Sequence, residues 1–299
     1  MFRNAILAIF TFVVSTSALS AQQVQFKFEL KDGLKYTERQ RTVRSATVQG
    51  SKETQSRESD ITTQYTVRKV QGGYDIVART LNASMKRNGK NAADPVTGAL
   101  STTEITMSVS DKGAFLQLKD AARLIAQVMQ AVPAEVRPAM QKLLTVETLT
   151  ARAANDWNAR VPRFLNMTGE IGDAWTSTDS APLLTGGQAT FFTVTTLDKL
   201  TPCASAQCVL IKMDYNTDPN ELSSSFGEGV GKLLKDAGAK DIGLSDVKII
   251  GKGEFVVNPS TAMLHSEKFE RNMDMTITGK EGPMRTHVVE TRTSEFTYY

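Results

Sequence analysis

The chain has 299 residues, with 35 Lys and Arg against 32 Asp and Glu, two cysteines and two histidines. Hydrophobic residues make up 40% and charged residues 22% of the chain, proportions that exclude a polytopic membrane protein and a wholly disordered chain. The formal net charge of +3 is a small surplus spread along the sequence, so nucleic-acid binding has no compositional support. The length fits one or two domains.

The first 21 residues have the three parts of a secretory signal peptide. Arg3 gives a basic start, residues 5–14 (AILAIFTFVV) form an apolar run, and small and polar residues follow it. The apolar run is shorter than the ~20 residues that a transmembrane helix needs. We expect cleavage after Ser20 or Ala21 and a mature protein, beginning near Gln22, that is periplasmic or secreted and does not span the membrane. No cysteine follows the cleavage region to carry a lipid anchor.

The two cysteines are predicted to form a disulfide. Cys203 and Cys208 stand between two runs rich in β-formers, with Pro202 at the entrance of the turn, which indicates a hairpin. An exported protein meets oxidising conditions, where such a pair becomes a bridge. A redox or metal role is the alternative, but the C-x-x-C spacing is absent and the sequence offers no third or fourth ligand nearby.

Alternating apolar and polar residues predict strands through the first third of the mature chain. Residues 23–30 alternate with period two, and extended stretches follow at about 34–48, 60–70 and 74–88, separated by polar or glycine-containing breaks. An antiparallel meander is the simplest connection. Many alternate positions are polar on both faces, which favours an open, curved sheet with much exposed area.

Between about residues 119 and 164, apolar residues recur at three- and four-residue spacing. This pattern predicts two short helices, one through 124–132 and one through 136–144. A third is expected through 149–157, with Pro162 closing the helical stretch.

The final third of the chain returns to strand patterns after one more helical stripe. That stripe runs over 222–234 and contains three glycines, and the strands that follow it include a hairpin loop at 279–283. We therefore predict an α+β fold in which a long, curved, half-barrel-like antiparallel sheet packs against a few short central helices. Residues 22–299 are expected to form a single domain.

Two segments resemble ligand-binding loops but lack residues that those loops require. Residues 227–232 (GEGVGK) look like a phosphate loop, but Phe226 and Leu233 replace required residues. Residues 214–218 begin like a calcium loop, yet Pro219 replaces the glycine that such a loop needs, so we expect a turn.

His265 and His287 are the only histidines. Both are predicted on the C-terminal hairpin. If it folds about residue 281, His287 pairs near Met275 and the two rings lie on the order of 30 Å apart, because a strand advances ~3.3 Å per residue. A shared metal or substrate site is therefore not expected, although either ring could act beside a carboxylate or serine elsewhere in the fold.

Three carboxylates near these histidines could in principle form a glycosidase pair. They are Glu267, Glu270 and Asp274. Lys268 and Arg271 are interleaved with them, which favours ordinary cross-strand charge pairing.

Phenylalanines are the candidates for the core or for an apolar pocket, and the sequence does not separate the two. The set is Phe26, Phe28, Phe115, Phe191, Phe192, Phe255 and Phe269.

Two segments carry a resemblance to known proteins. With Gly172, Asp173 and Trp175, residues 167–178 (MTGEIGDAWTST) resemble the sheet re-entry step of an uncharacterised family of exported bacterial proteins. Residues 253–267 (GEFVVNPSTAMLHSE) resemble the strand, Asp-Pro turn, strand element of periplasmic lipoprotein carriers and related lipoproteins.

The sequence departs from the carrier pattern at two positions, because Asn258 replaces the usual Asp and Ala262 the usual Gly. The resemblance implies a half-barrel sheet wrapped over helices in an exported protein, and it supplies no catalytic residues.

Two functions follow as hypotheses. The first is a non-enzymatic protein that binds a lipid, another apolar ligand or a hydrophobic partner segment in a cavity lined by Phe and Met. The second is a structural or interaction module of the cell envelope with a packed core. No catalytic motif, metal site or cofactor is identified, and the ligand-binding residues are not predicted.

Overall fold

A computed structural model describes most of the chain from residue 23 onward. The described residues are 23–51, 53–93, 97–98, 101, 103–165, 167–182, 188–204, 206–225, 227, 243–279 and 282–299. The expected signal peptide lies outside them. So do residues 228–242, which hold most of the glycine-rich stripe; before them, residues 219–225 are helical as predicted.

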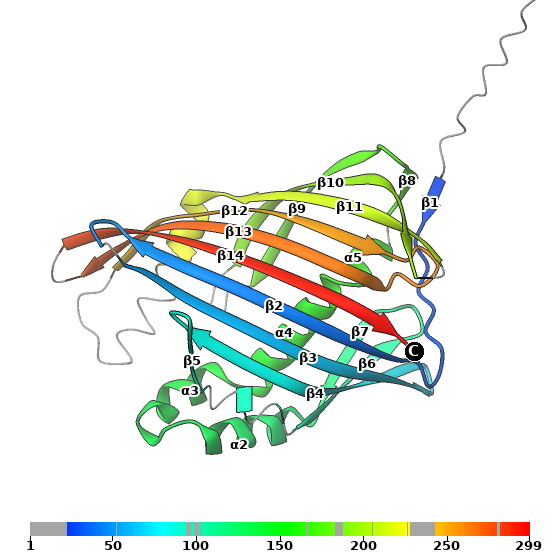
Figure 1. Cartoon of the computed structure of the whole chain (residues 1–299), viewed down its shortest axis with the longest axis horizontal. Helices are drawn as coiled ribbons and strands as arrows, with labels where there is room; N and C mark the ends of the chain where they lie inside the picture. Colours follow the sequence, from blue (N-terminus) through cyan, green and yellow to red (C-terminus); the bar gives the residue numbers. More distant parts are fainter. Residues whose placement is uncertain are drawn as a thin grey trace, which may run out of the picture.

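A twelve-stranded antiparallel sheet dominates the structure (Figure 1). Its N-terminal strands are β2 (Lys35–Val48), β3 (Thr54–Val70), β4 (Gly73–Arg87), β5 (Lys90–Asn91), β6 (Glu104–Ser110) and β7 (Phe115–Lys119). Its C-terminal strands are β9 (Ala174–Pro182), β10 (Gln188–Cys203), β11 (Ala206–Thr217), β12 (Gly243–Val257), β13 (Leu264–Gly279) and β14 (Gly282–Tyr298). A separate ribbon pairs β1 (Gln23–Gln25) with β8 (Thr168–Glu170).

The sheet consists of two meanders that meet in the middle. The order is β7-β6-β4-β3-β2-β14-β13-β12-β11-β10-β9, with β5 beside β4. The last strand of the chain thus pairs with β2, and Tyr298 lies opposite Tyr36. Among the described strands, the end strands β7 and β9 pair with no further strand, so the sheet is not closed.

Short helices connect the two meanders behind the strands, in the view of Figure 1. They are α2 (Ala121–Ala131), the 3-10 turn η1 (Ala134–Val136), α3 (Arg137–Leu143), α4 (Val146–Asn158) and α5 (Pro162–Leu165). Thr145 begins α4 with a capping box that it forms with Thr148. Pro162 begins α5 and does not end the helical stretch, because proline is tolerated in the first turn of a helix.

The main hydrophobic core lies between one face of the sheet, here called the inner face, and α4 with α5. The indole N–H of Trp157 donates to the carbonyl of Gly113 at 2.8 Å. Phe164 is fully buried, with its ring centroid 5.6 Å from that of Phe255. Other members of this core are Tyr36, Val67, Ile76, Val109, Val161, Leu197, Val209 and Ile211. A smaller cluster is formed by Ala189, Leu222, Val247 and Ile249.

Two strand boundaries differ from the sequence prediction. Only residues 23–25 of the expected first strand form a ladder, and the rest of the segment lies extended with Phe26 and Leu30 in the core. At the other boundary, β3 begins at Thr54, within the stretch predicted to be a break. The polar residues there are tolerated because outward positions of a sheet remain in water.

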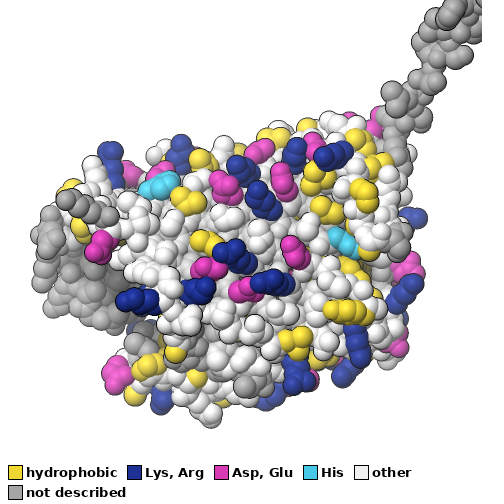
Figure 2. Space-filling model, in the orientation of Figure 1, with side chains coloured by type: hydrophobic (Ala, Val, Ile, Leu, Met, Phe, Trp, Pro, Cys, Tyr) yellow, Lys and Arg dark blue, Asp and Glu magenta, His cyan; other side chains and the backbone are white. Residues whose placement is uncertain are grey.

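The opposite, outer face of the central strands carries interleaved opposite charges (Figure 2). Arg39 pairs with Asp60 at 2.7 Å and Arg41 with Glu58 at 2.8 Å, both across β2 and β3. These pairs are mostly exposed, so water and salt screen them and they add little to stability. This face is therefore a solvated surface.

Candidate functional site

A cavity of about 380 Å³ lies between α4 and the inner face of the N-terminal meander and β14. Most of its walls are apolar. The apolar lining includes Ile61, Ile76, Ala78, Ile105, Met107, Leu118, Ala153, Trp157, Val161, Met263, Leu264 and Phe296. The volume falls within the range typical of small-molecule sites. None of the phenylalanines proposed from the sequence lines this cavity; Phe296, Met107 and Met263 do.

An ion pair forms part of the cavity wall. Glu38 on β2 and Arg160, which follows α4, both line the cavity, and Arg160 Nη1 donates to Glu38 Oε2 at 2.9 Å. The Tyr65 hydroxyl donates to the same oxygen at 2.8 Å. The Glu38 side chain is 5% exposed and that of Arg160 is 23% exposed, so this pair is largely removed from water.

The pair continues into a second carboxylate behind it. Arg160 Nε lies 3.9 Å from Glu267 Oε2, and Arg292 donates to the other oxygen of Glu267. Glu38 and Arg160 are 122 residues apart in the sequence, and Glu267 lies on β13 in the other meander. Arg160 therefore joins the two halves of the sheet.

Three polar atoms in this cluster are buried and have no hydrogen-bond partner among the described residues. They are Glu38 Oε1, Glu267 Oε2 and Arg292 Nε. Glu267 and Ser294 lie directly opposite each other on β13 and β14. Unpaired buried polar atoms cost free energy, so this cluster has capacity for a water molecule or a ligand group.

The cluster keeps Glu38 ionised. Burial alone would raise the pKa of Glu38, but the charge of Arg160 and the hydrogen bonds from Arg160, Tyr65 and Ser294 outweigh it, so the pKa lies below its ordinary value. Burial, reinforced by the negative charge of Glu38, raises the pKa of the Tyr36, Tyr65 and Tyr298 hydroxyls above 10.0. These hydroxyls therefore stay protonated, and those of Tyr65 and Tyr298 donate to Glu38 and to the carbonyl of Leu264.

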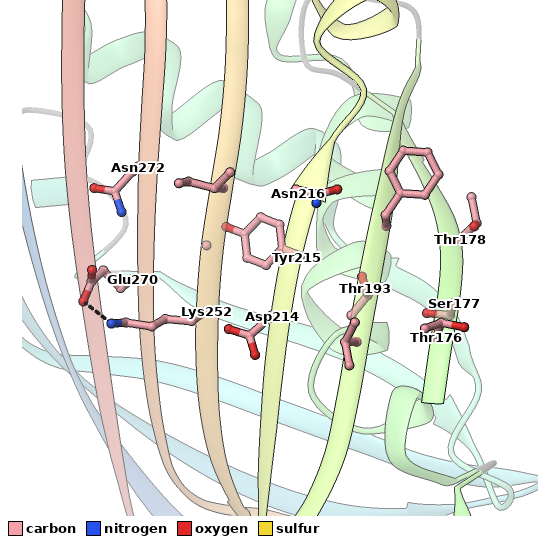
Figure 3. Close-up of a pocket in the computed structure, with 14 residues that line it drawn as sticks. Thr176, Ser177, Thr178, Thr193, Asp214, Tyr215, Asn216, Lys252, Glu270 and Asn272 are labelled. Carbon is pink, nitrogen blue, oxygen red and sulfur yellow. Dashed lines mark ion pairs between the residues drawn. The ribbon is translucent and has the colours of Figure 1, made fainter. Parts of the chain in front are cut away.

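A second hollow, of about 760 Å³, lies on the outer face near the β9 edge (Figure 3). Two cross-strand rows build it, Thr178-Phe192-Asn216-Ile250-Asn272 and Thr176-Val194-Asp214-Lys252-Glu270. Phe192, Val194 and Ile250 are 45%, 42% and 41% exposed. Lys252 pairs with Glu270 across this hollow at 3.6 Å.

The two cysteines are bonded at the tip of the β10–β11 hairpin. Cys203 and Cys208 have their Cα atoms 5.7 Å apart, and both are buried. A ring nitrogen of His265 and the two sulfurs lie within 4.8 Å of one another. Sequence patterns do not predict this neighbour, because His265 comes from β13. In the disulfide form the sulfurs are not thiolate ligands, so this group is not a metal site.

The second histidine lies far along the same hairpin. His287 is opposite Asp274, one residue from the predicted partner, and its Nδ1 lies 2.7 Å from Asp274 Oδ1. His265 precedes Asp274 by nine residues on β13, so the register separates the two rings. Burial lowers the pKa of His265, which favours its neutral form.

The three candidate carboxylates of β13 do not form a catalytic pair. Glu267 faces inward and pairs with Arg292, whereas Glu270 and Asp274 face outward. Glu270 pairs with Lys252 on β12. Cross-strand charge pairing is thus the observed arrangement, with partners on neighbouring strands.

Both segments that carried the family resemblance form tight turns. Gly172 has φ +101°, and its N–H donates to the carbonyl of Leu197 at 2.7 Å. In the second turn, Asn258 Oδ1 accepts from the Ser260 N–H at 2.9 Å, as an aspartate would. Ala262 has φ +55°, a left-handed conformation that explains why glycine is usual there.

The chain matches no described sequence family and no curated protein. Among solved structures, lipovitellin, described for its lipid–protein interactions, aligns over 88% of this chain and 25% of its own at 9% identity and TM-score 0.44. An exported protein of Bacteroides fragilis with a YmcC-like fold aligns over 89% of this chain and 97% of its own, at 12% identity and TM-score 0.24. A DUF1329 family protein of Desulfovibrio piger aligns over 89% of this chain and 84% of its own, at 9% identity and TM-score 0.13.

These similarities are distant, and this chain spans about a quarter of the lipovitellin chain it matches. The fold and the site define the protein as an open antiparallel sheet with an apolar cavity between the sheet and a helix. Within the part of the chain that the structure describes, no helix combines the length and apolar character needed to cross a membrane.

Proposed function

We propose that this protein is an exported, non-enzymatic binding protein that holds an apolar or amphiphilic ligand in the cavity beside α4. The cavity of about 380 Å³ with mainly apolar walls is the observation that carries the proposal. Burial of apolar ligand surface contributes about 25 cal/mol per Å², which suits an acyl or similar chain. We place the protein in the periplasm or outside the cell, with the sheet curved as a half-barrel around the ligand.

The chemistry of the cavity favours binding over catalysis. Glu38 is a buried carboxylate in the cavity wall, and it accepts hydrogen bonds from both Arg160 and Tyr65. A general acid or base works best with a pKa near the operating pH, whereas the pKa of Glu38 is held below its ordinary value. The pair is suited to fixing the position of a ligand.

Mass spectrometry of residues 22–299 under native and denaturing conditions tests this proposal. The protein is purified without detergent and then offered single-chain lipids. We expect a co-purifying or added amphiphile bound at one copy per chain. An apo mass that persists with every lipid offered would overturn the proposal.

A matched pair of variants locates the ligand. Ala153 on α4 lines the cavity, whereas Ala151 on the same helix is exposed. Ala153→Phe should fill part of the cavity and reduce uptake at least tenfold, and Ala151→Phe should leave uptake unchanged. Circular dichroism confirms that both variants fold. Equal uptake by both would place the ligand elsewhere.

A second candidate function is an interaction module of the cell envelope. The exposed side chains of Phe192, Val194 and Ile250 around the outer hollow support it, since contiguous exposed apolar surface marks interaction sites. The occupant would be a protein segment with apolar side chains. A photo-crosslinking residue placed at position 192 tests this candidate, with one at position 41 on the same face as the control. We expect a defined adduct from position 192 and none from position 41, and equal adducts from both would contradict this candidate.

A further inference from the structure

The buried polar cluster at the cavity has a mixed composition. Glu38 Oε1 and Glu267 Oε2 require hydrogen-bond donors, and Arg292 Nε requires an acceptor. Glu38 and Glu267 are 4% and 3% exposed, and Ser294 is 1% exposed. Glu38 lines the cavity, and Arg160 links it to Glu267. Glu38 thus presents an unsatisfied acceptor at the wall of a mainly apolar cavity, and Glu267 and Arg292 lie behind it.

The charges in the cluster already balance. Two carboxylates, Glu38 and Glu267, face two guanidinium groups, Arg160 and Arg292. Beyond the cluster, the exposed Asp156 adds one negative charge to the cavity lining, and the positive charge of Arg163 acts on Glu267. The surroundings therefore hold no net charge, and an incoming charged group would lose its hydration without gaining a net counter-charge, which is costly in a buried site.

From this we propose that the ligand is an uncharged amphiphile whose polar end, a hydroxyl or a comparable neutral donor and acceptor, is held at the Glu38–Arg160 pair, directly or through one water molecule. This inference rests on the proposed function. A hydroxyl group donates to a carboxylate oxygen and accepts from a guanidinium N–H at the same time. A carboxylate head would be repelled by Glu38, and an ammonium head would compete with Arg160.

Three single-chain amphiphiles of equal length test this assignment: a long-chain alcohol, the corresponding fatty acid and the corresponding alkylamine. Their affinities for the wild-type protein are compared at pH 7 by displacement of a fluorescent apolar probe. We expect the alcohol to bind at least tenfold more tightly than the acid or the amine. Equal affinities for the alcohol and the acid would overturn the inference.

Glu38→Gln provides the decisive change of charge. It removes one negative charge from the cluster and leaves Arg160 with Glu267, at 3.9 Å, as its remaining carboxylate partner in the cluster. The affinity for the fatty acid should then rise at least tenfold relative to that for the alcohol. Glu290→Gln is the matched control, because Glu290 pairs with Arg271 at 3.0 Å on the inner face and does not line the cavity.

The outcomes separate this inference from the proposed function. If no amphiphile binds, the proposed function fails. If amphiphiles bind but Glu38→Gln and Glu290→Gln behave alike, only the inference on the polar end fails. Should Glu38→Gln not fold, as judged by circular dichroism, the wild-type comparison of alcohol with acid still decides the question.

Discussion

Replacing Arg160 with methionine should destabilise the protein through two carboxylates at once. Methionine keeps an unbranched apolar stem but removes the guanidinium that donates to Glu38 at 2.9 Å and lies 3.9 Å from Glu267. Glu38 then keeps only hydrogen bonds to neutral groups, the hydroxyls of Tyr65 and Ser294. Glu267 keeps Arg292. The variant thus leaves Glu38 as a buried carboxylate without a counter-charge.

The expected loss follows from the burial of the pair. Removing one partner of a buried ion pair costs about 3 to 5 kcal/mol. Because the Arg160 side chain is 23% exposed and that of Glu38 is 5% exposed, we expect the lower end, about 3 kcal/mol. That is a large fraction of the ~5 to 15 kcal/mol by which domains are stable.

The loss should depend on pH in a defined direction. In the wild type the folded-state pKa of Glu38 is below its ordinary value of 4.5, so its stabilising contribution is present above pH 4.5 and is lost as the pH falls through the folded-state pKa. In Arg160→Met, only the hydrogen bonds from Tyr65 and Ser294 still oppose the effect of burial on Glu38, and we expect burial to raise that pKa above the unfolded value. The variant therefore regains stability relative to the wild type as the pH falls from 7 toward 5.

Urea denaturation at pH 7 and pH 5, followed by tryptophan fluorescence, measures both effects. Arg41→Met is the control, because its pair with Glu58 lies on the outer face and should contribute less than about 1 kcal/mol. A loss below 1 kcal/mol for Arg160→Met at pH 7 would refute the reasoning on magnitude. A difference from wild type that stays constant between the two pH values would refute the role of Glu38.

Further outcomes concern the hairpin tip and the sheet. Changing Cys203 and Cys208 together to alanine should lower the free energy of unfolding by about 2 kcal/mol, because a short closed loop removes little unfolded-chain entropy; a failure to fold would contradict this local role. Gly251→Ala should cost about 1 to 3 kcal/mol, since a Cβ there would lie 2.4 Å from the Tyr215 ring. Gly279→Ala, with no atom within 4 Å of its Cβ, should change the free energy of unfolding by less than about 0.5 kcal/mol in the same denaturation assay.

Local patterns predicted much of the fold. The spacing of Leu124 and Val128 anticipated α2, and the period-two pattern of the C-terminal third anticipated the β13–β14 hairpin to within one residue of register. The start of β3 at Thr54 was missed because its polar residues look like a loop in the sequence. The cross-strand charge pairing that the sequence favoured for Glu267, Glu270 and Asp274 is observed, because each has a basic partner on a neighbouring strand.

The candidate site was beyond sequence reasoning. No sequence pattern around Glu38 distinguishes it from the other charged residues of a polar strand. Arg160 likewise has no sequence feature that separates it from other charged residues at helix ends. Their importance comes from burial and from a contact across 122 residues. The same holds for His265, which approaches the disulfide only because β11 and β13 are brought together by β12.

By itself, the sequence determined the alternation of strands and short helices and the position of the paired cysteines, because these depend on side chains a few residues apart. Only the tertiary structure decided that the last strand pairs with β2, that the helical segment covers the inner face, and that a cavity with a balanced charge cluster remains between them. The physical reason is that burial, pairing across a sheet and charge balance are set by residues distant in the chain, which no local pattern records.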